Sequence, residues 1–180
     1  MPKSHRAKLR EIGWREWIAL PDLGIPRIKA KIDTGARTTA LHAVELNVVK
    51  KGGLEWVEFS VPFSGLPKDQ RFTAPIVDER EIKNTSGQKE LRYIIESTLV
   101  LNERHWRIEL SLANREKMEF EVILGRTAIR WHGYLINPGR SYLAGLPEPA
   151  ATTPHTDPDD GLLRTLAHRS GSHAPKGSKT

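Results

Sequence analysis

Ile28-Lys29-Ala30-Lys31-Ile32-Asp33-Thr34-Gly35-Ala36 is the stretch from which the fold of this 180-residue chain is predicted. Apolar and polar residues alternate up to Ile32, which is typical of a half-buried strand. The alternation stops at Asp33-Thr34-Gly35, where glycine permits a sharp turn and the close approach of another backbone. A strand end is a rigid place from which to present a carboxylate, so Asp33 is a candidate general base that activates water.

A second stretch, Phe120-Glu121-Val122-Ile123-Leu124-Gly125-Arg126, is an apolar strand that ends in Gly-Arg. Thr127 to Trp131 then reads as a short helix. With these two stretches the chain resembles retropepsins, the single-domain aspartic proteases. In that family Asp-Thr-Gly-Ala carries the catalytic aspartate, and a later Gly-Arg strand threads beside it before the only helix. The resemblance spans Ile25 to Leu143.

Three segments are similar to a narrower bacterial group, the RimB-like proteins. They are Ala30 to Ala43, which reads AKIDTGARTTALHA, then Glu90-Leu91-Arg92-Tyr93-Ile94-Ile95, and finally Ile123-Leu124-Gly125-Arg126. Members of this group are often labelled "ATP-dependent zinc protease". They are linked to ATP-grasp ligases that add glutamates to proteins, so the resemblance implies such a ligase as a further partner.

Many short strands and frequent turns predict an all-β fold. The resemblance implies a retropepsin-like closed barrel, the acid protease fold, with one short helix after the Gly-Arg strand and last strands at 134–137 and 141–143. After Leu146 the sequence becomes rich in Pro, Ser, Thr and Gly. We therefore expect a flexible basic N-terminus at 1–10, a peptidase domain at 11–146 and a disordered tail at 147–180.

The composition limits the chemistry that this chain can perform. It has no cysteine, which excludes disulfides, thiolate zinc ligands and a cysteine nucleophile. The net charge of +6 and the isoelectric point of about 9.7 favour acidic partners. No apolar run follows the basic N-terminus, so we expect no signal peptide, no membrane contact and a cytoplasmic location.

An aspartic protease needs two carboxylates that share one proton, so that one acts as base and the other as acid. The chain contains a single Asp-Thr-Gly. The second carboxylate must then be Asp33 of another copy, which predicts a homodimer with the active site on its two-fold axis. The resemblance implies that Asp33 is catalytic and that the following residues support it: Thr34, Gly35, Ala36, Gly125 and Arg126.

The chain departs from the retroviral pattern directly after Asp-Thr-Gly-Ala. Retroviral members usually have acidic residues there, one of which pairs with the Gly-Arg arginine, whereas this chain has Arg37 and Thr38. Arg126 therefore needs another partner, and Arg37 adds a cation to the cleft. Since guanidinium groups bind carboxylates, we expect acidic peptides as substrates, such as ligase-added glutamate tails on a ribosomal protein. The predicted substrate-binding residues are Lys31, Arg37, Thr38, Lys83, Lys89 and Arg92. The alternative is that these cations are solvated or paired with Glu79, Glu81 and Glu90.

A turn cluster, Asn84-Thr85-Ser86-Gly87-Gln88, separates two strand-like runs between the two motifs. A retropepsin has its flap at this place, a hairpin that closes over substrate and excludes water. We predict a flap here, with an ordinary surface hairpin as the alternative.

No His-Glu-x-x-His motif is present, and His42, His105 and His132 occur singly. We therefore expect no metal and no cofactor, and no direct contact with nucleic acid. Two other functions stay open. One is a non-catalytic module that binds a partner in a glutamate-ligase system, and the other is a zinc-dependent peptidase.

Overall fold

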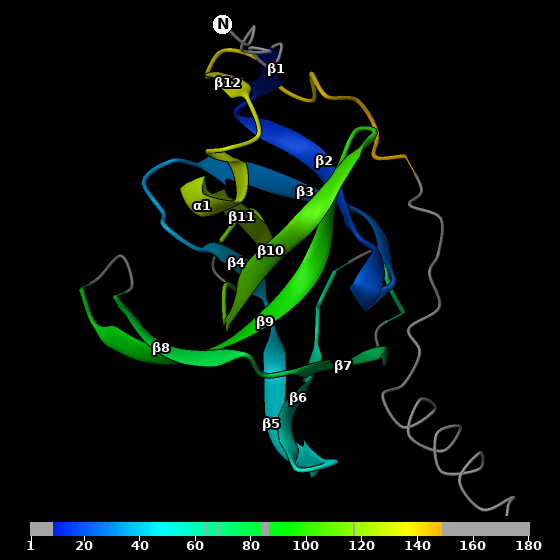
Figure 1. Ribbon diagram of the computed structural model, residues 1–180, viewed down its shortest axis with the longest axis vertical. Helices are drawn as coiled ribbons and strands as arrows, with labels where there is room; N and C mark the ends of the chain where they lie inside the picture. The colour runs from blue at the N-terminus through cyan, green and yellow to red at the C-terminus, as the bar shows by residue number, and fades with distance from the viewer. Residues whose placement is uncertain (1–8, 64, 68, 84–86, 117, 149–180) are drawn as a thin grey trace, which may run out of the picture.

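A computed structural model describes residues 9–63, 65–67, 69–83, 87–116 and 118–148. Strands dominate it (Figure 1). In chain order the elements are β1 (Arg10–Gly13), β2 (Arg15–Leu20), the 3₁₀ turn η1 (Pro21–Leu23), β3 (Ile25–Asp33), β4 (Thr39–His42), β5 (Val44–Lys51), β6 (Leu54–Ser60), β7 (Arg71–Pro75), β8 (Asp78–Lys83), β9 (Lys89–Leu101), β10 (Arg104–Ala113), β11 (Val122–Gly125), the helix α1 (Arg126–Ile129) and β12 (Tyr134–Asn137).

The main sheet has the strand order β10-β4-β11-β3-β2-β9-β8, and β9 also pairs with β10. These pairings connect six strands in a ring. The link between β2 and β9 consists of one residue pair, Ala19 with Val100, whereas β9 and β10 pair over a long antiparallel stretch. The prediction of an all-β fold with a short helix after the Gly-Arg strand is confirmed.

Strand β11 runs between β3 and β4, parallel to the first and antiparallel to the second. The register places Gly125 directly beside Asp33. The two motif stretches are far apart in the sequence, but they lie side by side at the carboxyl ends of parallel strands. This threading orders the loop that follows Asp33.

The alternation in β3 separates core from surface. Ile28, Ala30 and Ile32 are buried, and they pack in one core cluster with residues such as Val122 and Leu124 of β11. Each fully buried isoleucine, valine or leucine side chain contributes about 1.5–3 kcal/mol to the stability of the fold. The intervening residues of β3 face outward, so one strand both anchors the core and presents side chains to solvent.

Two further units extend from the ring (Figure 1). Strands β5, β6 and β7 form a three-stranded antiparallel sheet. Strand β8 pairs with the first half of β9, from Asp78 opposite Ile94 to Lys83 opposite Lys89. The predicted hairpin between the two motifs is therefore present. Of its predicted tip at 84–88, residues 84–86 lie outside the described residues.

The first and last strands of the domain pair with each other. Strand β1 pairs in parallel with β12, and after β1 the chain continues into β2. The predicted strand at 141–143 is not a strand. Instead, buried Glu16 accepts hydrogen bonds from the backbone N–H groups of Gly13 (2.5 Å), Leu143 (2.9 Å) and Ala144 (3.2 Å). The carboxylate thus satisfies two N–H groups of this irregular segment, and the Tyr142 N–H donates to the Arg15 carbonyl at 2.9 Å.

Arg10, which the sequence analysis assigned to the N-terminal segment, is the first residue of β1. Most of the predicted tail, residues 149–180, lies outside the described residues. Neither helix in the described part of the chain has the length and apolar character needed to span a bilayer.

Candidate active site

Asp33 ends β3 with its carboxylate held by its own loop. Oδ1 accepts hydrogen bonds from the backbone N–H groups of Gly35 (3.0 Å) and Ala36 (3.1 Å). No hydrogen bond within the described chain occupies Oδ2. A Cβ atom added at Gly35 would lie 3.2 Å from Oδ1, so glycine leaves the carboxylate room. The loop fixes one carboxylate oxygen and leaves the other for a reacting group.

Arg126 and the start of α1 also hold the Asp33 loop, through hydrogen bonds to its backbone carbonyl oxygens. The Arg126 guanidinium donates to the carbonyl oxygens of Gly35 (3.0 Å) and Thr34 (3.3 Å). Its backbone N–H donates to the Ala36 carbonyl at 2.9 Å. The Thr127 hydroxyl donates to the Arg37 carbonyl at 2.7 Å. The missing acidic partner of Arg126 is thus replaced by backbone carbonyls of the Asp33 loop.

Gly125 lies where two backbones touch. A Cβ atom on it would come within 2.6 Å of the Thr38 carbonyl carbon and 2.8 Å of the Arg37 carbonyl oxygen. Its N–H donates to the buried Thr39 hydroxyl at 3.1 Å. The Ser111 hydroxyl in turn donates to the Thr39 carbonyl at 3.1 Å. Only glycine allows β11 to approach the loop this closely.

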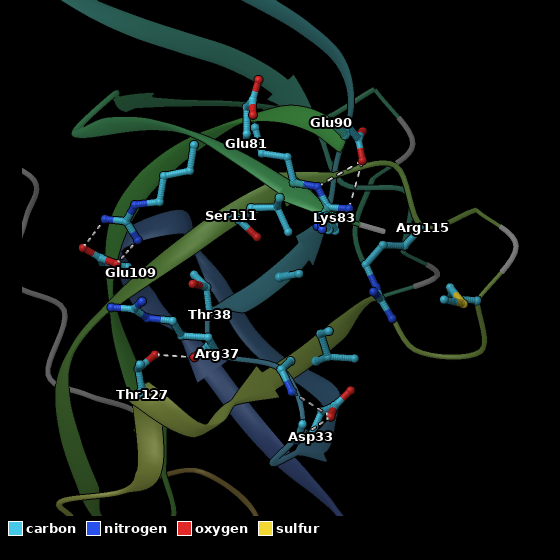
Figure 2. Close-up of a pocket in the computed structure, with 18 of the residues that line it drawn as sticks. Asp33, Arg37, Thr38, Glu81, Lys83, Glu90, Glu109, Ser111, Arg115 and Thr127 are labelled. Carbon is cyan, nitrogen blue, oxygen red and sulfur yellow. Dashed lines mark hydrogen bonds and ion pairs between the residues drawn. The ribbon is translucent and has the colours of Figure 1, made fainter. Parts of the chain in front are cut away.

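Asp33 lines a cleft of about 1580 Å³. Figure 2 shows Asp33 and Arg37 on one side and Lys83 and Glu90 opposite them. The 33–40 segment and β11 form one side, β10 with residues 114–116 and 118 form the walls, and the β8–β9 hairpin covers the cleft. Residues of both hairpin strands line it, as a flap requires.

Two carboxylates of the cleft are neutralised by neighbouring arginines. Arg80 donates to Glu109 at 2.6 and 2.9 Å and to Asp78 at 2.6 Å. These hydrogen bonds raise the pKa of Arg80 and lower the pKa of Glu109. Arg92 is paired with Glu90 at 2.9 Å. These groups shape the cleft as ion pairs, with little free charge for a ligand.

Other cations of the cleft have no carboxylate within ion-pair distance among the described residues. They are Arg37, Lys83, Arg115 and Arg130. Arg115 is half-buried, and burial lowers the pKa of its guanidinium, with a further lowering from nearby Arg92. Its Nε donates to the Phe120 carbonyl at 3.3 Å, and its backbone N–H donates to Nδ1 of buried His42 at 2.8 Å. Arg115 is therefore a fixed, poorly solvated cation.

The structure brings most of the predicted site residues together. Those that line the cleft are Asp33, Gly35, Ala36, Arg37, Thr38, Lys83 and Arg92. Thr34, Gly125 and Arg126 hold the loop without lining the cleft. Lys31 and Lys89 do not line it, and Lys89 pairs with Glu81 at 2.8 Å. Of the predicted flap tip, Asn84, Thr85 and Ser86 lie outside the described residues, and Gly87 and Gln88 are not part of the lining.

Several lining residues were not predicted from the sequence, namely Arg80, Glu109, Ser111, Arg115 and Arg130. Each comes from an element whose position depends on long-range pairing. In the described part of the chain, no group of three or more His, Asp or Glu side chains is arranged to hold a metal ion.

The family model described as "Retropepsin-like aspartic endopeptidase RimB" matches residues 11–147. The chain belongs to this RimB-like family. A crystal structure of Lpg0085 from Legionella pneumophila, a protein described as of unknown function, is similar with a TM-score of 0.64 and 26% identity. The match covers 74% of this chain and 97% of that one. The RimB-like fold thus accounts for nearly all of a separately solved protein.

Curated relatives of this RimB-like chain carry another name. A "Probable alpha-L-glutamate ligase" of Desulfotalea psychrophila is 45% identical over 122 residues, which are 66% of this chain and 26% of that protein. One of Shewanella pealeana is 40% identical over 136 residues, which are 74% of this chain and 30% of that protein. The chain spans less than a third of the length of these relatives.

Proposed function

We propose that this RimB-like chain is an aspartic endopeptidase whose two catalytic carboxylates are Asp33 of two identical subunits. The observation that supports this most is the Asp33 loop. One carboxylate oxygen is fixed by two backbone N–H groups, and the residue lines a cleft of about 1580 Å³. The family description supports the same chemistry.

In this mechanism one Asp33 is ionised and takes a proton from a water molecule, which attacks the peptide carbonyl carbon. The other Asp33 is protonated and donates to the carbonyl oxygen. The tetrahedral intermediate then collapses as a proton passes to the leaving nitrogen. Two carboxylates held close together share one proton because they cannot both ionise easily.

The second carboxylate has no source within the described chain. Glu90 and Glu109 line the cleft but are paired with arginines, and Glu81 is paired with Lys89. Glu116 also lines the cleft. None of them forms a hydrogen bond with Asp33. A second copy of the chain supplies an equivalent Asp33 by symmetry, so the proposed site is complete only in a homodimer.

The proposed substrates are acidic peptides, including glutamate-rich tails. Arg37, Lys83 and Arg115 present positive charge to the cleft without a carboxylate partner in the described residues. A partly buried guanidinium binds carboxylates strongly because water competes less there. Since the ligase name of the relatives concerns glutamate, a tail built by such a ligase is the substrate that we propose.

Replacing Arg37 with alanine should raise KM for a glutamate-rich peptide about tenfold, because one charge-assisted hydrogen bond is lost. KM for a matched neutral peptide should change far less. Steady-state kinetics on the two peptides measure the difference. Lys50→Ala, which removes an exposed charge of β5 outside the cleft, is the control. Equal effects of Arg37→Ala on both peptides would contradict the acidic-cleft proposal.

A statine-type transition-state mimic should inhibit the enzyme, because its hydroxyl takes the place of the attacking water between the two carboxylates. A chelator should leave the rate unchanged. Peptide hydrolysis is measured with each compound, and the zinc content of the purified protein is determined. Loss of activity in chelator that zinc restores would instead support the zinc-dependent alternative.

A second candidate function follows from the relatives. Because the chain matches only a part of proteins named as ligases, it is also a candidate non-catalytic module that binds a partner in a glutamate-ligase system. This candidate predicts that wild-type protein cleaves no peptide and that capture of the ligase survives Asp33→Asn. If the wild-type protein hydrolyses peptides and the Asp33→Asn variant does not, the result supports the peptidase and contradicts the non-catalytic module.

A further inference from the structure

Before Asp33 at the end of β3, the outward face of β2 and β3 gathers cations without carboxylates. Arg15 lies opposite Lys31 and Trp17 lies opposite Lys29 in the antiparallel register, and Arg27 precedes them on β3. In the described chain none of these four cations forms an ion pair. The one acidic residue of β2 is fully buried and faces inward. We call this face the β2–β3 strip: Arg15, Trp17, Arg27, Lys29, Lys31 and Tyr142.

Aromatic rings hold the cations of the strip in place. The Arg27 guanidinium carbon and the Lys29 Nζ lie 5.1 and 5.2 Å from the centre of the Trp17 ring. The Arg15 guanidinium carbon lies 5.2 Å from the centre of the Tyr142 ring. A ring attracts a cation but does not neutralise it. The strip is therefore a set of positioned positive charges that are open to an acidic ligand.

The strip continues into the cleft. In the parallel register Lys31 lies beside Ile123 of β11, and Ile123 lines the cleft. Neighbouring strands are about 4.8 Å apart, so the first cation of the strip is one strand away from a residue that lines the cleft, and it is two residues before Asp33 on β3. A peptide that leaves the cleft across β11 meets Lys31 first and Lys29 next.

We infer that the β2–β3 strip binds the acidic flank of the peptide substrate outside the cleft. Arg27, Lys29 and Lys31 alternate along one strand, so their side chains recur about every 6.6–6.8 Å. Side chains on one side of an extended peptide recur at the same interval, so glutamates at alternate positions match the three cations. This inference rests on the proposed function, because the ligand is the substrate of the cleft.

The rings favour a carboxylate ligand over a nucleic acid. Proteins that bind single-stranded nucleic acid stack bases on open aromatic faces. Here Trp17 is stacked on Tyr142, with ring centres 5.6 Å apart and planes 27° apart, and Arg27 and Lys29 lie over its ring. A base would have to displace these contacts, whereas a carboxylate only has to reach the exposed charges.

The test uses full-length protein with Asp33→Asn, so that binding is measured without hydrolysis. Two fluorescent peptides share one core, and one carries a flank of about six glutamates, long enough to follow the strip, while the other carries serines. Fluorescence anisotropy gives both dissociation constants. Lys29→Ser with Lys31→Ser should weaken binding of the glutamate peptide about three- to tenfold, since an exposed ion pair contributes little by itself, and should reduce the difference between the peptides.

Lys50→Ser with Lys51→Ser is the matched control, because it removes the same charge from β5. An equal loss with the control, or an equal loss for both peptides, overturns the inference. The inference is also overturned if a single-stranded oligonucleotide with the charge of the glutamate peptide binds more tightly than that peptide and this binding depends on Lys29 and Lys31. Hydrolysis by the wild-type chain is measured separately. Its absence overturns the proposed function, whereas hydrolysis without a selective effect of the lysine pair overturns only the strip.

Discussion

Replacing Asp33 with asparagine should abolish peptide hydrolysis, with a loss of about a thousandfold or more in kcat. An amide cannot take the proton from water, and general base catalysis alone contributes factors of this size. The fold should persist, because the asparagine oxygen can still accept the N–H groups of Gly35 and Ala36. Hydrolysis of a glutamate-rich peptide and thermal unfolding check the two halves of this prediction.

Mixing tests whether the site is shared between two subunits. In an equal mixture of wild-type and Asp33→Asn chains, about half of the wild-type chains pair with an inactive partner, so the activity per wild-type chain should fall to about half. Unchanged activity per wild-type chain would contradict a shared dyad. Asp69→Asn, the same replacement at an exposed position, is the control and should leave both the rate and the mixing curve unchanged.

Replacing Glu16 with glutamine should lower the free energy of unfolding by about 2–4 kcal/mol. The buried carboxylate accepts hydrogen bonds from three backbone N–H groups. In glutamine an NH₂ group replaces one of the two oxygens, so that two hydrogen-bond donors face each other and neither has an acceptor. Breaking a buried charged hydrogen-bond network has a cost in this range. In a domain of this size each kcal/mol shifts Tm by about 2–4 °C, which calorimetry resolves.

Glu11→Gln is the matched control for Glu16. Glu11 is exposed on β1, where it accepts one hydrogen bond from the Asn137 side chain at 2.6 Å, so its replacement should change stability by about 0.5 kcal/mol or less. Similar Tm values for the two variants would show that Glu16 does not anchor the segment at Leu143 and Ala144.

Local pattern was sufficient to predict the central part of the fold. The alternation up to Ile32 predicted β3, and the apolar run before Gly125 predicted β11, because burial of one face sets a period of two. The pairing of these strands came from the family resemblance. Arg37 and Thr38 reached the cleft as expected because they belong to the same loop as Asp33.

Features that depend on distant pairing were not predicted. Lys31 was expected in the cleft because it is close to Asp33 in sequence, but it does not line the cleft, whereas its neighbour across the strands, Ile123 of β11, does. Arg115 enters the cleft from a loop that His42 holds, and no local signal indicates that contact. No local signal indicates that Glu16 is buried, because its partners at Leu143 and Ala144 lie 127 and 128 residues further along the chain.

The contacts of Arg126 have a consequence for assembly. Because Arg126 and the start of α1 brace the Asp33 loop within one chain, a separated subunit already contains its half of the proposed site in final form. Association then requires no ordering of that loop and brings together two preformed halves. The protein can be diluted until its subunits dissociate and then concentrated again. Activity should therefore return at the rate of subunit association, with no slow refolding step.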